Sequence, residues 1–340
     1  MHRALVIAVL LMAALSAWAD PPTAEQIQTW IRDLDSPTFR TRDQAAAKLR
    51  QAGAEAAPAL SKVAKTGGIE AADRALRILG DMADGSDAKA EEAARRQLRR
   101  LADGESRAAS DARTILGRKR NRILTQLLFA GAAYDEDGAE IRRVDLDHST
   151  DVPGLAPLLK EFPELESLSA STSRFTDKEA RHLAEMKNLQ DLNLFESSIS
   201  DEGLKHITEL KHLRWLPMGH TKVTDAGLKI ISGMTQLEYV GVRGDNITDA
   251  GLVHLKGLTD LTGLNLSETK VTNAGLKHLT PLTKLQTLYL PGTAVTDAGL
   301  EHLKELKDLH DLYLAKTKTT EAGRAKLKEA LPDLHFPDVD

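Results

Sequence analysis

One stretch of sequence decides the fold: Leu285-Gln-Thr-Leu288-Tyr-Leu290-Pro-Gly-Thr293-Ala-Val295-Thr-Asp-Ala-Gly299-Leu300-Glu-His-Leu303-Lys-Glu-Leu306. The hydrophobic spacing changes midway through it. Leu288 and Leu290 alternate with other residues, which is the period of a half-buried strand, whereas Leu300, Leu303 and Leu306 recur at helical spacing. The stretch therefore predicts a short strand that is followed by a helix.

The same pattern recurs every 24 residues through the second half of the chain. Its strand motifs begin at Val144, Leu168, Leu192, Leu216, Val240, Leu264, Leu288 and Leu312, and Phe336 stands at the equivalent place in a truncated last unit. One strand and one short helix bury too little surface to fold alone, but stacked units share their surfaces. We therefore expect a solenoid of short parallel strands plus helices over residues 144–340.

The start of each helix is marked by a recurring polar pair, because Thr, Asp and Asn supply N-cap oxygens. The pairs are Thr224-Asp225, Thr248-Asp249, Thr272-Asn273 and Thr296-Asp297. A glycine follows shortly afterwards, at Gly203, Gly227, Gly251, Gly275, Gly299 and Gly323. The missing side chain indicates either close packing or a special backbone dihedral at these positions.

The consensus Leu-x-x-Leu-x-Leu-x-x-Thr-x-Val-Thr-Asp-Ala-Gly-Leu-x-x-Leu resembles leucine-rich repeats, most of all the bacterial and F-box-associated subclasses. The resemblance covers residues 144–336 and implies a curved solenoid, with strands on its concave side and helices on its convex side. It also implies protein binding without catalysis. The usual asparagine ladder is replaced by Ser149, Ser173, Ser197, Thr221, Asp245, Thr269, Thr293 and Thr317. These short side chains are expected to bond the backbone of the neighbouring turn.

The first half, residues 20–130, is Ala-rich and predicts an all-helical domain. Its apolar residues recur at spacings of three and four, as in Ile69, Leu76 and Leu79. The segment Asp35-Ser-Pro-Thr-Phe39-x-x-Arg42-x-x-Ala45-Ala46-x-x-Leu49-x-x-Ala52-Gly resembles a HEAT-type repeat, and this resemblance covers residues 23–83. The fold class expected for the chain is an α/β solenoid of leucine-rich repeats preceded by an all-α HEAT-like helical region.

The N-terminus has the pattern of a secretory signal. A charged start precedes an apolar run from Ala4 to Ala17, and Ala17-Trp18-Ala19 offers the small residues that signal peptidase needs. The run is shorter than the roughly 20 residues of a membrane span. We expect the signal peptide, residues 1–19, to be cleaved near Ala19. The mature chain would then be exported, to the periplasm or the extracellular space, without a transmembrane segment.

Residues 131–143 join the two halves and predict a hairpin. Its turn would be Asp137-Gly138, a pair typical of two-residue hairpin loops. An uncovered strand edge invites aggregation. The hairpin is therefore expected to cover the exposed edge of the first repeat.

Charge is divided between the two halves. Residues 20–134 contain 20 basic and 16 acidic side chains, a net charge of +4, whereas residues 135–340 contain 24 and 34, a net charge of −10. Ten basic residues lie between Arg95 and Arg122. A solvated helix face and a docking surface for acidic repeats both fit this cluster. Nucleic acid is disfavoured, because aromatic residues are not interleaved with the basic ones.

Side chains on either side of the buried leucines are expected to face the concave surface. Candidate partner-binding residues there are Phe195, Trp215, Tyr239, Arg243, Tyr289 and Tyr313. Trp215 and Tyr239 occupy equivalent places in adjacent units, as do Tyr289 and Tyr313, and strands about 4.8 Å apart would bring each pair into contact. Exposed Trp, Tyr and Arg dominate binding hot spots, while cross-strand packing is the alternative role.

No metal or cofactor is expected. His182, His206, His254, His278 and His302 form a column at the repeat period. Neighbouring helices lie about 8–10 Å apart, whereas two zinc ligands must come within roughly 3–4 Å of each other. The column is therefore interpreted as a consensus helix residue, and the chain has no Cys for a thiolate site.

Catalysis is not indicated either, because the chain contains no HExxH, Walker, GxSxG or GxGxxG motif. The sequence favours an exported, non-catalytic scaffold that binds another protein through the concave repeat surface. A module that binds carbohydrate or cell-wall glycan through the aromatic patch is the alternative. A hydrolase whose site follows no recognisable motif is a third hypothesis.

Overall fold

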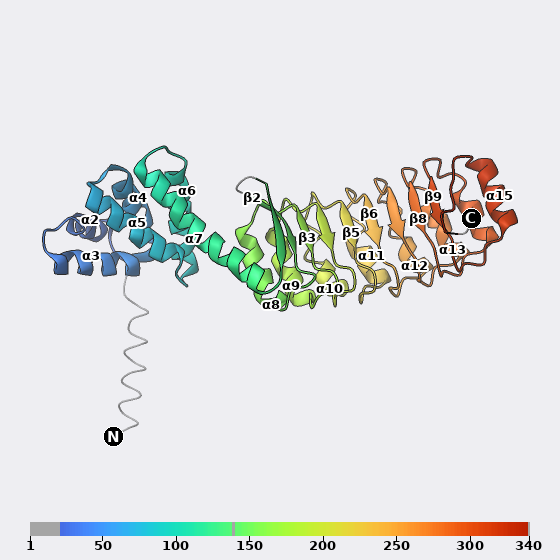
Figure 1. Cartoon of the computed structure of the whole chain (residues 1–340), viewed down its shortest axis with the longest axis horizontal. Helices are drawn as coiled ribbons and strands as arrows, with labels where there is room; N and C mark the ends of the chain where they lie inside the picture. The colour runs from blue at the N-terminus through green and yellow to red at the C-terminus, as the bar shows by residue number, and fades with distance from the viewer. Residues whose placement is uncertain (1–20, 138–139, 339–340) are drawn as a thin grey trace, which may run out of the picture. The chain divides into compact units, whose positions relative to one another are not determined.

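The structure is a computed structural model that describes residues 21–137 and 140–338 (Figure 1). These residues form two compact units, divided between Ile123 and Leu124. The first unit is helical, and the second is a repeat solenoid. The predicted signal peptide, residues 1–19, lies outside the described residues, as does the Gly138 half of the predicted hairpin turn.

The first unit is built from successive helices with a core of Leu and Ala. They are α2 (Ala24–Asp33), α3 (Phe39–Ala52), the 3-10 turn η2 (Gly53–Glu55), α4 (Ala57–Thr66), α5 (Ile69–Ala83), α6 (Ala88–Ala102) and α7 (Arg107–Phe129), whose end belongs to the second unit. α2 packs on α3, α4 on α5, and α5 on α6. Small Ala side chains such as Ala56, Ala75 and Ala94, all fully buried, let these helices approach closely.

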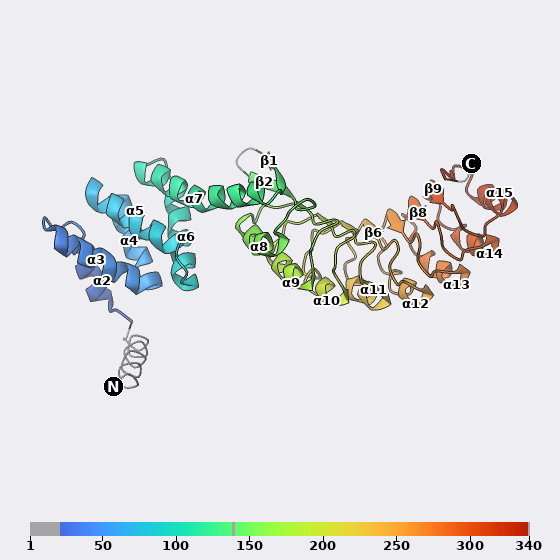
Figure 2. The same cartoon turned by 60° about the horizontal axis from the view of Figure 1, so that its bottom comes forward.

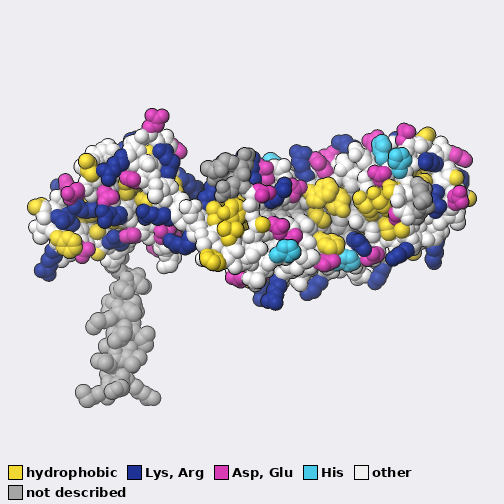
Figure 3. Space-filling model, viewed as in Figure 1, with side chains coloured by type: hydrophobic (Ala, Val, Ile, Leu, Met, Phe, Trp, Pro, Cys, Tyr) yellow, Lys and Arg dark blue, Asp and Glu magenta, His cyan; other side chains and the backbone are white. Residues whose placement is uncertain are grey.

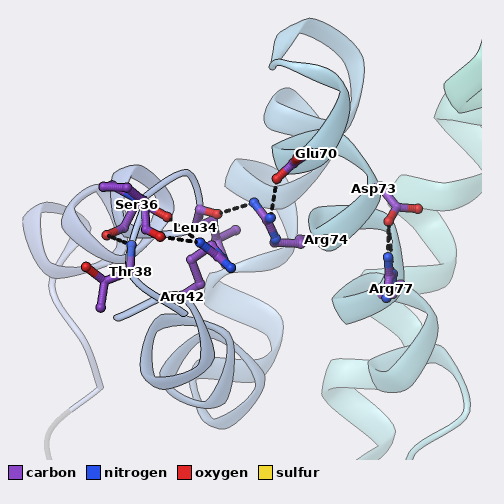
Figure 4. A network of polar contacts seen from close by, with 9 residues as sticks. Leu34, Ser36, Thr38, Arg42, Glu70, Asp73, Arg74 and Arg77 are labelled. Atoms are coloured by element: carbon purple, nitrogen blue, oxygen red, sulfur yellow. Dashed lines mark hydrogen bonds and ion pairs between the residues drawn. The ribbon is translucent and has the colours of Figure 1, made fainter. Parts of the chain in front are cut away.

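Two arginines tie the turn between α2 and α3 into the first unit (Figure 4). Arg42 donates to the carbonyl oxygens of Ser36 and Pro37 at 2.8 and 2.9 Å. Arg74, on α5, donates to the carbonyl oxygen of Leu34 at 2.8 Å. Leu34 is the C-cap of α2, where carbonyls lack intrahelical partners, so Arg74 satisfies one of these groups. Arg42 satisfies two carbonyls of the loop that precedes α3.

The second unit contains one sheet of nine strands in sequence order. The strands are β1 (Ala133–Asp137), β2 (Glu140–Asp145), β3 (Ser167–Ser169), β4 (Asp191–Asn193), β5 (Trp215–Pro217), β6 (Tyr239–Gly241), β7 (Gly263–Asn265), β8 (Thr287–Tyr289) and β9 (Asp311–Tyr313). From β2 onward the strands are parallel, and each pairs with the next in a register of 24 residues. The repeat period of the sequence is thus the strand register of the structure.

β1 is antiparallel to β2 and occupies the N-terminal edge of the sheet. β2 runs on to Asp145, past the expected limit of the hairpin at residue 143. One strand therefore belongs both to the hairpin and to the first repeat, because the parallel pairing of Val144 with Leu168 extends it.

Short helices follow the strands and lie on the outer side of the curved second unit, with the strands on its inner side (Figure 2). They are α8 (Val152–Leu155), η3 (Ala156–Glu161), α9 (Asp177–Ala180), η4 (Arg181–Glu185), α10 (Asp201–Leu204), α11 (Asp225–Ile231), α12 (Asp249–Leu252), α13 (Asn273–Leu276), η5 (Lys277–Leu279), α14 (Asp297–Leu300), η6 (Glu301–Leu303) and α15 (Glu321–Ala330). The core lies between the two layers, where Leu192, Leu216, Leu264 and Leu288 are fully buried.

A polar ladder joins successive units on the helix side. The Thr of each pair is the N-cap, as Thr272 is for α13, and the Asp reaches the next unit. Asp249 accepts from the Thr272 N–H at 2.8 Å and from its hydroxyl at 2.6 Å. The same two bonds link Asp177 to Ser200, Asp201 to Thr224, Asp225 to Thr248 and Asp297 to Thr320. Asn273 likewise accepts from the Thr296 N–H at 2.8 Å, but its own amide N–H donates to the Thr296 hydroxyl.

The glycine of each unit leaves room for this ladder. A Cβ at Gly251 would lie 2.2 Å from Asp225 Oδ1, and one at Gly275 would lie 2.3 Å from Asp249 Oδ1. Neither glycine has a positive φ. Of the two explanations left open by the sequence, close packing is therefore the correct one.

The expected role of the hydroxyl column is wrong for most of its members. The hydroxyls of Thr269, Thr293 and Thr317 donate to carbonyls three residues back in their own units, at 2.6 to 2.7 Å. Asp245 and Thr221 instead bond each other across adjacent units, because Asp245 accepts from the Thr221 N–H at 2.6 Å and lies 3.2 Å from the Thr221 hydroxyl. A hydroxyl reaches its own strand first, so the ladder between units lies in the Asp–Thr column instead.

Candidate binding surface

Four of the six candidate residues form two stacked aromatic pairs on the strand face. Trp215 pairs in register with Tyr239, and their rings stack with centroids 4.0 Å apart and planes 10° from parallel. Tyr289 pairs with Tyr313, with centroids 4.3 Å apart and planes at 16°. Trp215 is 46% exposed. Both contacts predicted from the repeat period are therefore present.

Glycines on neighbouring strands make the first pair possible. A Cβ at Gly263 would lie 2.6 Å from Cδ2 of Tyr239, and a Cβ at Gly241 would lie 3.2 Å from its hydroxyl. The Tyr239 ring therefore covers backbone that carries no side chain. Burial raises the pKa of the Tyr239 hydroxyl above its ordinary value. The Tyr239 ring is therefore fixed by its packing against this backbone, and it supports the more exposed Trp215.

Phe195 and Arg243, the other two candidates, do not touch each other. Phe195 meets His220 edge to face, with ring centroids 5.4 Å apart at 82°. Arg243 pairs with Glu268 at 2.7 Å, and the other oxygen of Glu268 lies 3.8 Å from His220 Nε2. The two candidates are therefore the ends of one row, joined through two residues that the sequence pattern did not single out.

Those two residues belong to a turn position with an unusual backbone. The residues there have positive φ in unit after unit: Thr172, Glu196, His220, Gly244, Glu268, Gly292 and Lys316. A left-handed residue redirects its side chain relative to a strand residue. The position consequently places polar side chains beside the aromatic ones. In the sequence, this turn position is marked only by its 24-residue period, because its residues are a mixture of Thr, Glu, His, Gly and Lys.

Two hollows lie along this face. The larger, about 470 Å³, is lined by Arg243, Asn265, Ser267, Glu268, Tyr289, Pro291, Gly292, Ala315 and Lys316. The smaller, about 200 Å³, is lined by Asp135, Arg142, Arg143, Glu166, Ser167, Gln190 and Asp191. Figure 3 shows hydrophobic side chains in separate patches on the second unit, with acidic and basic ones between them. The strand face therefore combines aromatic and charged contacts.

Asp191 was not predicted from the sequence, yet it lies in register with Trp215. Burial raises the pKa of its carboxyl, and the charges of Glu166 and Glu238 add to this effect, while Arg143 opposes it. Glu166 and Glu238 each have an arginine, Arg142 at 2.5 Å and Arg214 at 2.6 Å. In residues 21–137 and 140–338, no side chain forms an ion pair with Asp191.

A metal site and the basic segment from Arg95 to Arg122 are the two other features that the sequence raised. Among the described residues, no group of three or more His, Cys, Asp or Glu side chains could hold a metal ion. In the basic segment, Arg95 pairs with Glu91 at 3.1 Å, Arg96 with Glu92 at 2.5 Å and Arg122 with Asp84 at 3.8 Å. These partners neutralise part of the cluster, which favours a solvated helix face.

No family model and no curated protein sequence matches the chain. Among solved structures it is similar to an internalin C2 from Listeria monocytogenes, at 22% identity and a TM-score of 0.42 over 52% of this chain and 71% of that one. A leucine-rich repeat protein from Leptospira interrogans matches at 19% identity and 0.39, over 53% and 50%. The ectodomain of a receptor kinase from Arabidopsis thaliana, in complex with Casparian strip integrity factor 2, matches at 14% and 0.40, over 60% and 25%.

The chain thus spans half or less of the length of the last two structures. The assignment of a leucine-rich-repeat solenoid rests on the strand register and buried leucines of the second unit itself. Within the ranges that the structure describes, no helix has both the length and the apolar character needed to cross a membrane.

Proposed function

We propose that this chain is an exported, non-catalytic binding protein whose second unit contacts a partner protein through its strand face. The observation that carries the proposal is the pair of aromatic stacks, Trp215–Tyr239 and Tyr289–Tyr313, on that face. Aromatic residues are only 4% of the chain. Their concentration on one open surface is typical of a contact site, because large rigid rings dominate hot spots.

The surroundings of the stacks favour a protein over a glycan. In each pair, one face of each ring is covered by its neighbour along the sheet. A free ring face accepts a sugar ring or a protein side chain equally, so the rings alone do not decide between the two partner classes. The charged row of Arg243, Glu268 and His220 beside the rings suits a protein partner.

Export and the role of the first unit belong to the same proposal. Residues 1–19 would direct the chain across a membrane and be removed. The HEAT-like helices of residues 20–130 would support the repeats or offer a second surface. The packed pairs α2–α3 and α4–α5 are consistent with such a helical repeat region.

The test is cross-linking and capture from the exported compartment with the mature chain. Trp215→Ala with Tyr239→Ala removes one stack, and Tyr289→Ala with Tyr313→Ala removes the other. His254→Ala with His278→Ala is the matched control, because it also replaces two ring side chains by alanine, but on the helix side of the second unit. Each variant must retain the circular dichroism and urea midpoint of a folded chain.

At least one aromatic variant should lose the captured partner, with affinity at least tenfold lower in a purified binding assay, while the histidine control keeps it. A tenfold loss corresponds to about 1.4 kcal/mol, which exceeds the roughly 1 kcal/mol that most interface residues do not reach. If both aromatic variants captured the partner as efficiently as the wild-type chain, the proposal would be contradicted. A glycan array with signal that depends on the same rings would replace protein with carbohydrate as the partner class.

A further inference from the structure

The Trp215 indole has one face covered and one face open to its other neighbour. Tyr239 covers the first face at 4.0 Å. Along the sheet, the strand on the opposite side is β4, whose Asp191 is in register with Trp215. Adjacent strands are about 4.8 Å apart. The uncovered indole face and the Asp191 carboxylate therefore border the same space.

Acidic and basic side chains both line the hollow beside that space. Glu166 and Glu238 belong to the neighbouring strand edges, and each is already engaged by an arginine of its own. The charge of Arg143 lowers the pKa of Asp191, but Arg143 lies two strands away from Asp191 and three from Trp215, and it pairs with Asp135 at 3.7 Å. The partly buried Asp191 carboxylate lines the 200 Å³ hollow and has no ion-pair partner among the described residues.

We infer that Asp191 and the open face of Trp215 together receive an arginine side chain of the partner protein. This inference rests on the proposed function and names the chemistry of its partner. A guanidinium group stacks on an indole face and simultaneously bonds a carboxylate, which no neutral or acidic side chain does. Tyr239 serves as the support that keeps the indole upright, because its own ring is held over Gly263.

The probe is a pair of eight-residue Gly-Ser peptides, one with two arginines and the other with two citrullines. Citrulline keeps the shape of arginine and lacks its charge. Trp30→Phe in the mature chain leaves Trp215 as its single tryptophan, since Trp18 lies in the signal. Trp215 emission then reports binding directly, and calorimetry measures affinity for variants that lack the indole.

The arginine peptide should perturb Trp215 emission and bind at least tenfold more tightly than the citrulline peptide at low salt. Asp191→Asn should lower its affinity about tenfold and Trp215→Leu about fivefold. Asp311→Asn is the matched control, because Asp311 occupies the equivalent strand position beside Tyr313. It should change affinity less than twofold.

Equal binding of the two peptides would overturn the inference, and so would equal losses from Asp191→Asn and Asp311→Asn, which would reveal only diffuse attraction to an acidic surface. Neither result touches the proposed function. That proposal is decided separately, by whether partner capture depends on the aromatic stacks.

Discussion

Asp245 is a carboxylic acid buried within the repeat stack, and its titration should weaken the fold as the pH rises. It is 3% exposed and occupies the column in which other units have Ser or Thr. Its carboxyl accepts from the Thr221 N–H at 2.6 Å and lies 3.2 Å from the Thr221 hydroxyl. Burial raises its pKa from 3.8 to about 7, and these hydrogen bonds oppose the rise.

The sign follows from the direction of that shift. The folded state binds the proton more tightly than the unfolded state, so the contribution of Asp245 is fully present below pH 3.8 and is lost as the pH rises toward about 7. Each unit of pKa difference corresponds to about 1.4 kcal/mol. Over the whole shift the loss is at most about 4 kcal/mol, and above pH 7 it stays constant.

Asp245→Asn isolates this effect, because the amide keeps the acceptor for Thr221 and never ionises. Urea unfolding of both proteins at pH 4.5, 6 and 8 gives the difference in unfolding free energy for the transition of the second unit. The variant should gain on the wild type by up to about 3 kcal/mol between the ends of this range, because part of the loss already occurs below pH 4.5. Other groups titrate in both proteins and cancel. A difference that stays flat with pH, or a variant that is less stable at pH 8, would refute the reasoning.

The remaining predictions concern packing. Asp249→Ala should cost about 2–4 kcal/mol, because it leaves the Thr272 N–H without its acceptor. Asp249→Asn should cost under about 1 kcal/mol, because Asn273 already accepts from the Thr296 N–H and bonds the Thr296 hydroxyl as a donor. Equal urea midpoints for the two variants would contradict this. Gly263→Ala should push the Tyr239 ring off Trp215, lowering stability by about 1–3 kcal/mol and shifting tryptophan emission; an unchanged spectrum would count against a held stack. Thr172→Gly should stabilise the chain by about 1 kcal/mol, because a β-branched residue with a φ of 50° is strained; a lower urea midpoint would argue the opposite.

The repeat layer was predictable because its signal is periodic. Leu192, Leu216, Leu264 and Leu288 were expected to be buried at one interval, and all are. The two aromatic stacks followed from the same arithmetic, because in a parallel sheet with a constant register, equivalent residues must be neighbours. The buried leucines and the aromatic stacks both depend only on the repeat period, so the sequence alone predicted them.

Side-chain direction was not predictable in the same way. Whether Thr269 bonds its own strand or the next unit depends on ångström-scale reach that spacing does not encode. His220 and Glu268 project beside the aromatic rings because their φ angles are positive. The residue types at this position vary from unit to unit, so the sequence does not indicate a positive φ. Asp191 was missed since its role depends on its neighbours, Trp215 on one side and paired glutamates on the other.

The repeats also contain an internal comparison that separates support from recognition. The ladder position on the helix side is Asp177, Asp201, Asp225, Asp249, Asn273 and Asp297. In every case it accepts from the backbone N–H of the N-cap residue in the next unit and bonds that residue's hydroxyl, and only at Asn273 does the side chain donate that second bond. The strand position before the buried leucine is instead Arg143, Ser167, Asp191, Trp215, Tyr239, Gly263, Thr287 and Asp311. A position that holds the stack together must repeat, since every unit meets the same neighbour. Because the ladder joins the units, the strand position does not have to repeat. Its side chains differ from unit to unit, and such variety is what a surface needs in order to distinguish one partner from another.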